Sequence, residues 1–246
     1  MKPAAGLNFT VIVMAKRPAP GRVKTRLTPP LSPGEAAGVH AAMLRCVLAR
    51  LERWLPGRKV LALDREVAPQ AVTQPRQARA SGGIPGPIPG LDAAAWTIVR
   101  QGEGDLGRRM TRVWQDVGGG AVAFFGSDSP DVPGDVLARL PEALERHDAA
   151  AGPTHDGGYW TLLARSFDTA GVLLRDIDWG TPAVYDQTCA ASRRHGLAFD
   201  ELPTWHDVDT FDDLAALRRR LEAVPHDADR DPALARLLPE LPHQGT

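Results

Sequence analysis

The sequence lacks the features that mark secreted, disulfide-rich or membrane-spanning proteins. It has only two cysteines in 246 residues, Cys46 and Cys189, and neither belongs to a C-x-x-C pair or to a Cys/His spacing. This excludes a disulfide framework and a zinc site of the usual pattern. No apolar run reaches membrane-spanning length, and the stretch before Lys16 is too short and too polar for a signal peptide. We therefore expect a cytoplasmic protein without membrane insertion.

The chain also lacks a strong net charge of either sign. Its 29 Lys and Arg residues are balanced by 30 Asp and Glu residues, which leaves a formal charge of −1. No chain-wide basic field is available to attract nucleic acid or an anionic membrane. The expected partner is therefore a small molecule, and the length allows a core that needs no disulfide or metal for stability.

Strand-like and helix-like patterns alternate along the chain, which predicts a mainly parallel sheet covered by helices. We expect one domain over residues 1–246, with a core at about 8–220, a surface loop at 81–90 and an accessory tail at about 225–246. The expected strands are 11–14, 60–63, 97–99, 121–125, one near 149, 159–163 and 197–202. The expected helices are 33–54, 106–117, 136–146, 182–195 and one from 211, followed by short helical stretches in the tail.

The most informative segment is V-I-V-M-A-K-R-P-A-P-G-R-V-K-T-R-L, residues 11–27. It has the pattern of a buried strand that runs into a basic loop. In an open α/β sheet the loop after the first strand lies at the carboxyl edge, where ligands bind, so cations there suggest a polyphosphate. A solvated basic turn would show the same composition. The loop carries five cations in eleven residues: Lys16, Arg17, Arg22, Lys24 and Arg26.

A second segment, G-S-D-S-P-D at 126–131, directly follows the most apolar predicted strand. Asp128 can hold Mg²⁺ or Mn²⁺, which take oxygen ligands and share them between carboxylates and substrate phosphates. Lys24 and Arg26 would neutralise the remaining phosphate charge. Asp131 precedes Val-Pro and also fits the N-cap of the next helix, so it is either a cap or a ligand.

A third acidic segment, H-D-V-D-T at 206–210, precedes the last long predicted helix. A metal site needs a second carboxylate, and Asp207 and Asp209 are the candidates. Thr210 and Asp213 have the spacing of a capping box, so the aspartates also fit a role at a helix end. His206 fits a neutral ligand, a packed ring or a solvent contact.

Glycine-rich sequence joins the third predicted strand to the next helix, in Q-G-E-G-D-L-G-R-R at 101–109. Its glycines expose backbone N–H groups that can meet a nucleotide. The spacing is not that of a dinucleotide-binding fingerprint. An ordinary helix with Asp105 as its N-cap would explain the same residues.

The segment T-H-D-G-G-Y-W at 154–160 places a carboxylate beside two aromatic side chains. Asp156 next to aromatic faces suits a sugar ring or a similar polar acceptor. The alternative is a bulged turn in which Tyr159 and Trp160 pack in the core, which we favour for Trp160.

Taken in order, these motifs resemble a bacterial family of glycosyltransferase-like transferases, over about residues 8–220. The motifs are K-T-R-L, Q-x-x-G-D-L-G-x-R-M, G-S-D-S-P-D, H-D-G-G-Y and D-V-D-T-F-D-D-L. The resemblance implies an α/β fold, the three-layer α/β/α nucleotide-diphospho-sugar transferase (GT-A, Rossmann-like) fold with a mixed, mainly parallel sheet. The first loop is also similar to that of 2-phospholactate guanylyltransferases, which bind GTP. The matching residues are Lys16, Lys24, Thr25, Arg26, Leu27, Leu31 and Ser32.

The resemblance implies the roles of Asp128 and Asp209, and the chemistry of the motifs gives the expected roles of the other residues. Asp128 and Asp209 are the expected ligands of Mg²⁺ or Mn²⁺, and Asp128, Asp156 and Lys24 are the expected catalytic residues. The expected acceptor-binding residues are Asp156, Gly157, Gly158, Tyr159 and Trp179. The expected nucleotide-binding residues are Ala15, Lys16, Gly21, Arg22, Lys24, Thr25, Arg26, Gly104, Asp105, Arg109 and Ser127.

Three functions stay open at this stage. The first is an enzyme that transfers a sugar from a nucleotide-sugar donor to a small-molecule acceptor. The second is a guanylyltransferase-like nucleotidyltransferase that uses a nucleoside triphosphate and releases pyrophosphate. The third is a nucleotide sensor without turnover. The resemblance and the aromatic Asp156 segment favour glycosyl transfer, whereas the basic loop favours nucleotidyl transfer.

Overall fold

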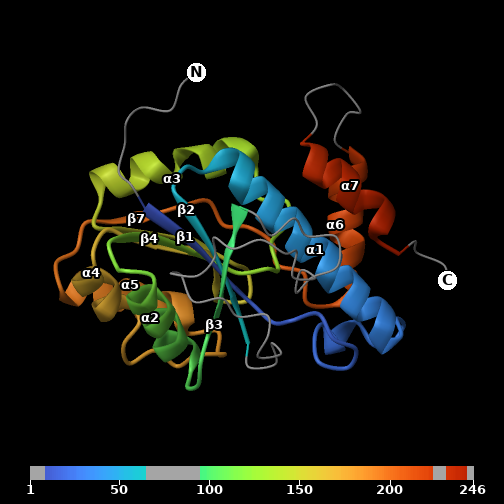
Figure 1. Cartoon of the computed structure of the whole chain (residues 1–246), viewed down its shortest axis with the longest axis horizontal. Coiled ribbons are helices and arrows are strands. Elements are labelled where there is room, and N and C mark those ends of the chain that lie inside the picture. Colours follow the sequence, from blue (N-terminus) through green and yellow to red (C-terminus); the bar gives the residue numbers. More distant parts are fainter. Residues whose placement is uncertain (1–8, 65–94, 224–230, 243–246) are drawn as a thin grey trace, which may run out of the picture.

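The computed structural model describes residues 9–64, 95–223 and 231–242 and shows a sheet between two layers of helices (Figure 1). The elements in chain order are β1 (Phe9–Ala15), η1 (Thr25–Leu27), α1 (Pro33–Trp54), β2 (Arg58–Leu63), β3 (Thr97–Arg100), α2 (Leu106–Asp116), β4 (Ala121–Phe125), α3 (Gly134–Arg146), β5 (Ala149–Pro153), β6 (Tyr159–Ala164), α4 (Phe167–Leu173), α5 (Val184–Arg194), β7 (Phe199–Glu201), α6 (Phe211–Ala223) and α7 (Pro232–Glu240). No helix in these ranges is long and apolar enough to span a membrane.

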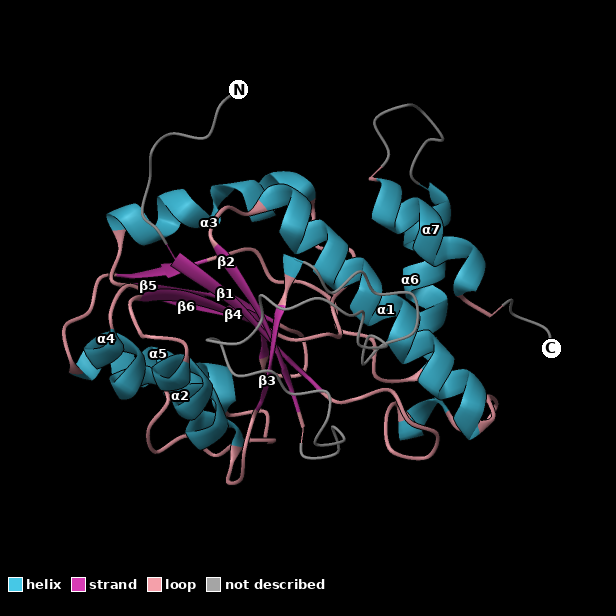
Figure 2. Cartoon of the chain, in the orientation of Figure 1, coloured by secondary structure: helices cyan, strands magenta, loops and turns pink. Residues whose placement is uncertain are grey.

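The described strands form one sheet in the order β3-β2-β1-β4-β6-β5-β7 (Figure 2). β1 pairs in parallel with β2 and β4, and the pairs β2–β3 and β5–β7 are also parallel. β6 runs antiparallel to both β4 and β5. The prediction of a mixed, mainly parallel sheet is therefore confirmed, and the loops after β1, β3 and β4 leave the same edge.

Alternate residues of the central strands face opposite helix layers, as the two-residue period of a strand requires. Val11 and Val13 of β1 pack toward α1 and α3, whereas Ile12 packs toward α2 and α4. Figure 1 shows α1 and α3 on one side of the sheet and α2, α4 and α5 on the other. Both faces are covered, and β1 accordingly has apolar side chains at every position except Thr10 rather than an alternating pattern.

Helix α1 is buried on two sides. Its start is a capping box, as predicted: the Ser32 hydroxyl accepts from the Glu35 N–H at 3.3 Å, and the Glu35 carboxylate accepts from the Ser32 N–H at 2.8 Å. One face packs on the sheet. Another face, which includes Met43, packs against Leu217 of α6 and Leu237 of α7. Both α6 and α7 therefore rest on α1, and α7 is the helical stretch predicted in the tail.

The structure corrects the sequence prediction at several elements. Helix α4 was not expected, because seven residues are too few to show a helical period. Asp131 is not the N-cap of α3, whose N-cap is Pro133. The Asp131 side chain is 5% exposed, and a carboxylate so buried needs a positively charged partner. That partner is Arg220, whose Nε lies 2.7 Å from Asp131 Oδ2. The predicted loop at 81–90 lies outside the described residues.

A buried arginine ties the loop after β4 to α1 and α7. The Arg50 side chain is 3% exposed. Its guanidinium donates to the carbonyl oxygen of Pro130 at 2.6 Å, to the carbonyl oxygen of Val132, and to the Asp231 carboxylate at 2.8 Å. The segment that carries Asp128 is thus held from behind by a residue of another element.

We expect Arg50→Ala to lower the free energy of unfolding by about 3–5 kcal/mol, because it removes the guanidinium that donates to two carbonyl oxygens and leaves the Asp231 carboxylate without its cation. Chemical denaturation followed by circular dichroism measures the change. Arg146→Ala is the control: Arg146 is 71% exposed and, within the described ranges, its ion pair is with Glu142 one helical turn away, so we expect a loss below about 0.5 kcal/mol. If both variants lost a similar amount of unfolding free energy, Arg50 would not be the residue that holds the loop after β4.

Candidate functional site

A pocket of about 300 Å³ opens at the carboxyl edge of the sheet. It is lined by the loop after β1, the start of α1, the β3–α2 connection, the loop after β4 and the segment before α6. The sequence analysis named nine of its lining residues: Ala15, Lys16, Lys24, Thr25, Arg26, Arg109, Ser127, Asp128 and Asp209. The structure therefore brings the basic loop and both predicted metal ligands into one place.

Lys24 lines this pocket and lies between the two aspartates. Its Nζ is 2.7 Å from Asp128 Oδ1 and 3.1 Å from Asp209 Oδ1, and it also donates to the carbonyl oxygen of Val208. The Lys24 side chain is only 5% exposed, compared with 42% for Asp128 and 38% for Asp209. One buried ammonium thus joins three loops that are distant in sequence.

The charges of this group stabilise one another. Burial alone would lower the pKa of Lys24, but Asp128 and Asp209 outweigh burial and raise it. Burial alone would raise the pKa of Asp128, but Lys24 outweighs burial and lowers it. Lys24 and Asp128 are therefore both charged at neutral pH.

The backbone of Lys24 is left-handed, with φ 47° and ψ 41°. For a residue other than glycine this conformation costs roughly 1–2 kcal/mol. The ion pairs with Asp128 and Asp209 hold the residue there, and the strain is located in the loop that faces the pocket.

Backbone hydrogen bonds join the three acidic segments. The Val208 N–H donates to the Asp128 carbonyl oxygen at 2.9 Å. The Trp205 N–H donates to the Pro153 carbonyl oxygen at 2.9 Å, and its indole N–H donates to Asp131 Oδ1 at 3.1 Å. Residues 205–208 are therefore fixed against the loops that follow β4 and β5.

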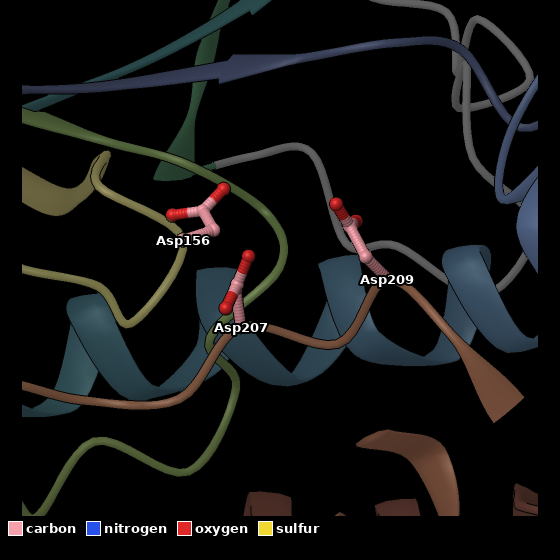
Figure 3. Close-up of side chains that lie close together, drawn as sticks. All are labelled: Asp156, Asp207 and Asp209. Atoms are coloured by element: carbon pink, nitrogen blue, oxygen red, sulfur yellow. The ribbon is translucent and has the colours of Figure 1, made fainter. Parts of the chain in front are cut away.

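Three carboxylates lie together, those of Asp156, Asp207 and Asp209, each of which offers an oxygen within 4.8 Å of the others (Figure 3). Of the three, Asp209 is the one that also pairs with Lys24. Asp156 Oδ1 accepts from the Thr154 hydroxyl at 2.6 Å and from the Gly158 N–H at 2.9 Å. Burial, followed by the charges of Asp156 and Asp209, raises the pKa of Asp207 to about 6.

These residues fit a hard divalent cation. Mg²⁺ and Mn²⁺ prefer carboxylate oxygens, and Asp209 belongs both to the pair with Asp128 and to the group with Asp156 and Asp207. The structure places Asp207 and Asp209 together, so the two candidates that the sequence left open lie in the same site. Thr210 and Asp213 also form the predicted capping box, at 3.3 and 2.7 Å.

Two polar residues of the pocket were missed by the sequence analysis. Gln101 is 2% exposed, and its amide donates to the carbonyl oxygens of Ala15 and Ala62 at 3.0 and 2.9 Å, while its side-chain oxygen accepts from Arg109. It therefore joins the ends of three strands and orients Arg109. The sequence did contain a signal for Gln101: it directly follows β3 and occupies the first position of the Q-x-x-G-D-L-G motif.

The other missed residue is His40 of α1, which is 3% exposed. Its Nε2 lies 2.9 Å from the carbonyl oxygen of Lys16, so this nitrogen is the donor and Nδ1 is unprotonated. Burial lowers its pKa. A histidine among apolar residues of a helix carries no sequence signal for a site.

Several predicted residues lie elsewhere. Gly21, Arg22 and Gly104 do not line the pocket. Asp105 caps α2 by accepting from the Arg108 N–H at 2.8 Å, which is the alternative that the sequence left open. It lines a second cavity of about 660 Å³ together with Trp179.

The predicted acceptor-binding residues do not all lie in the same place in the structure. The hydroxyl of Tyr159 is enclosed, with no hydrogen-bond partner among the described residues, and its ring meets Trp179 edge-on at 6.3 Å. Trp160 is 3% exposed and packs in the core, as favoured from the sequence. Gly157 and Gly158 form the turn that holds Asp156. Of this set, Asp156 is the residue that joins the carboxylate group.

The architecture is that of the nucleotide-diphospho-sugar transferase fold. A crystal structure from Desulfovibrio desulfuricans G20, described as a candidate nucleotide-diphospho-sugar transferase, is 30% identical, with a TM-score of 0.73 over 94% of each chain. The chain belongs to the family of bacterial proteins described as uncharacterized (DUF2064), whose model matches residues 55–181. The predicted family resemblance and fold class are confirmed.

More distant structures share the fold alone. A cytidylyltransferase from Leptospira borgpetersenii is 14% identical, with a TM-score of 0.54 over 89% of this chain and 88% of that one. A thymidylyltransferase-like protein from Bacillus anthracis is 11% identical, with a TM-score of 0.54 over 89% of this chain and 97% of that one. No protein with a curated description matches the chain in sequence.

We expect Asp207→Asn to raise the free energy of unfolding at pH 8 by about 1 kcal/mol when a chelator is present. The folded protein holds the Asp207 proton more tightly than the unfolded chain. The stability that this adds is complete below about pH 4 and is lost as the pH rises through about 6. The gain should therefore disappear at pH 4.

Urea denaturation at the two pH values measures this difference. Asp116→Asn, at an exposed position outside the carboxylate group, is the control, with an expected change below about 0.5 kcal/mol. An Asp207→Asn variant that is no more stable than the wild type at pH 8 would show that burial and the neighbouring carboxylates do not destabilise the charged form of Asp207.

Proposed function

We propose that the protein is a metal-dependent transferase that uses a nucleotide-sugar donor and a small-molecule acceptor. The observation that carries this proposal is the meeting of cations and carboxylates in one pocket: Lys16, Arg26 and Arg109 line the same pocket as Asp128 and Asp209. The Arg26 guanidinium lies 3.6 Å from Asp209 Oδ2. A site for a simple anion gains nothing from carboxylates, whereas a diphosphate with a divalent ion uses both charges. The name of the 30% identical relative supports the same class.

Each part of the pocket has a role in this reaction. Lys16, Arg26 and Arg109 bind and orient the diphosphate, and Gln101 fixes the direction of Arg109. Asp128 and Asp209 would hold Mg²⁺ or Mn²⁺, which when bound supplies positive charge that stabilises the departing diphosphate. Because the charges are held in place by the fold, they stabilise the transition state without reorganising.

The acceptor is activated by Asp156 in this proposal. The acceptor oxygen attacks the anomeric carbon of the sugar, and the bond from that carbon to the phosphate oxygen breaks. The nucleoside diphosphate leaves with the electron pair, and the acceptor proton passes to Asp156. Hydrogen bonds from Thr154 and Gly158 hold Asp156 Oδ1, which orients the carboxylate.

Nucleotidyl transfer is the second candidate, and the basic loop favours it. In that reaction an acceptor phosphate or carboxylate attacks the α-phosphorus of a nucleoside triphosphate, and pyrophosphate leaves with the bonding pair. A triphosphate carries more negative charge than a nucleotide sugar, and Lys16, Lys24 and Arg26 all come from this one loop. The resemblance of the loop to that of guanylyltransferases agrees with this alternative.

Calorimetric titration separates the candidates. The panel consists of nucleoside diphosphates, nucleoside triphosphates and UDP-, GDP- and ADP-sugars, each with Mn²⁺ and with chelator. Metal-dependent binding of one diphosphate and its sugar supports glycosyl transfer and names the donor. Preference for a triphosphate supports nucleotidyl transfer. Binding without metal dependence would favour a nucleotide sensor.

We expect Asp128→Ala to lower metal-dependent turnover by roughly 10²–10³-fold or more, because the carboxylate that positions the ion is lost. The fold should remain, since Lys24 keeps its ion pair with Asp209. Turnover is measured with the donor that the panel identifies, and circular dichroism checks the fold. Asp135→Ala removes an exposed carboxylate of α3 and serves as the control. Wild-type turnover in Asp128→Ala would remove Asp128 from the metal site.

We expect Asp156→Asn to lower kcat by roughly 10²–10⁴-fold, the usual contribution of a general base. Donor affinity should change less than about threefold, because the amide oxygen can still accept from Thr154 and Gly158. Steady-state kinetics and donor titration measure the two effects, with Asp186→Asn on α5 as the exposed control. A large loss of donor affinity would instead place Asp156 at the donor.

A further inference from the structure

The three N–H donors of the Lys24 ammonium are matched by three oxygen partners within the protein. They are Asp128 Oδ1 at 2.7 Å, Asp209 Oδ1 at 3.1 Å and the carbonyl oxygen of Val208. An ammonium has three donors and no acceptor. In this arrangement Lys24 is fully engaged by the protein and has no donor left for a phosphate.

The same two carboxylates are those that the proposed function assigns to the divalent ion, so this inference rests on that proposal. Mg²⁺ binds its oxygen ligands at about 2.0–2.1 Å. An ammonium within 3.1 Å of both Oδ1 atoms fills the space that such an ion requires. The charge of the Lys24 ammonium and the double charge of the ion would also repel each other strongly if both lay between the two carboxylates. The Lys24 ammonium and the divalent ion therefore exclude each other.

The pocket offers Lys24 another partner only when a phosphate is bound. Lys16, Arg26 and Arg109 line the pocket around it, so an anion drawn in by these cations arrives beside the ammonium. Phosphate oxygens would replace the carboxylates as acceptors, and the strained backbone at φ 47° can then relax. Withdrawal of Lys24 frees Asp128 and Asp209 for the ion.

We propose that Lys24 acts as an internal counter-ion that takes the place of the divalent cation between Asp128 and Asp209 and makes metal binding conditional on a polyphosphate. The coupling is reciprocal, because the metal, once bound, keeps Lys24 available to the phosphate. The ion and the donor then bind cooperatively, and the protein holds the metal weakly in the absence of a donor.

Titration with Mn²⁺ alone tests the first half of this proposal. Electron paramagnetic resonance of the free aqua ion reports binding to wild type, Lys24→Met and Lys24→Gln, without nucleotide and without turnover. We expect Mn²⁺ to bind Lys24→Met at least about tenfold more tightly than wild type. The gain should disappear when Asp128→Asn is added. Lys24→Gln, which keeps a polar side chain, serves if Lys24→Met does not fold.

Lys16→Met is the matched control, since it removes a cation from the same pocket. Lys16 lines that pocket and forms no ion pair with a carboxylate of the described residues. We expect Lys16→Met to change Mn²⁺ affinity by less than about threefold, because its charge acts only through solvent. Equal Mn²⁺ affinity in wild type and the Lys24 variants would overturn the proposal, and so would an equal gain in Lys16→Met.

A second titration, with inorganic pyrophosphate present, tests the coupling. A protein-free titration corrects for the Mn²⁺–pyrophosphate complex. We expect pyrophosphate to raise the Mn²⁺ affinity of wild type by about 5–150-fold, and to raise that of Lys24→Met much less. If pyrophosphate raised the Mn²⁺ affinity of wild type and of Lys24→Met by the same factor, the proposed coupling through Lys24 would be wrong. Failure of the proposed function would appear instead in the donor panel, as nucleotide binding without metal dependence.

Discussion

The ion pairs of Lys24 with Asp128 and Asp209 are the interaction on which the pocket depends. Lys24 comes from the loop after β1, Asp128 from the loop after β4 and Asp209 from the segment before α6. Removing any one of the three would leave a charge with an incomplete set of partners in a partly buried place, which is costly. The interaction therefore sets the distance between the basic loop and the acidic segments, and with it the width of the pocket.

The surrounding structure holds these three segments where they can meet. Parallel pairing of β1 with β2 and β4 sends their loops to one edge. The antiparallel β6 returns the chain next to β4, so that the Asp156 turn faces the same edge. Behind the pocket, Arg50 holds the loop after β4, and α6 rests against α1 through Leu217. The site is thus supported by the fold from three directions.

The local features of the chain could be predicted well because they depend on neighbouring residues. The capping box of α1 follows from the spacing of Ser32 and Glu35, and β4 follows from five consecutive apolar residues. The basic loop and the aspartate after β4 lie together because strand order in such a fold places their loops on one edge. Features without a local pattern, such as the short α4, were missed.

The sequence by itself determined which residues are charged, which strands are buried and which loops gather the charged side chains, because each of these depends on residue type and period. Only the tertiary structure decided how the charges pair. Asp131 became the partner of Arg220 rather than a helix cap, Tyr159 was enclosed, and Asp156 joined Asp207 and Asp209. It also placed Lys24 between the two predicted metal ligands. The physical reason is that electrostatic energy depends on distance through space and on burial, and neither can be read from positions along the chain.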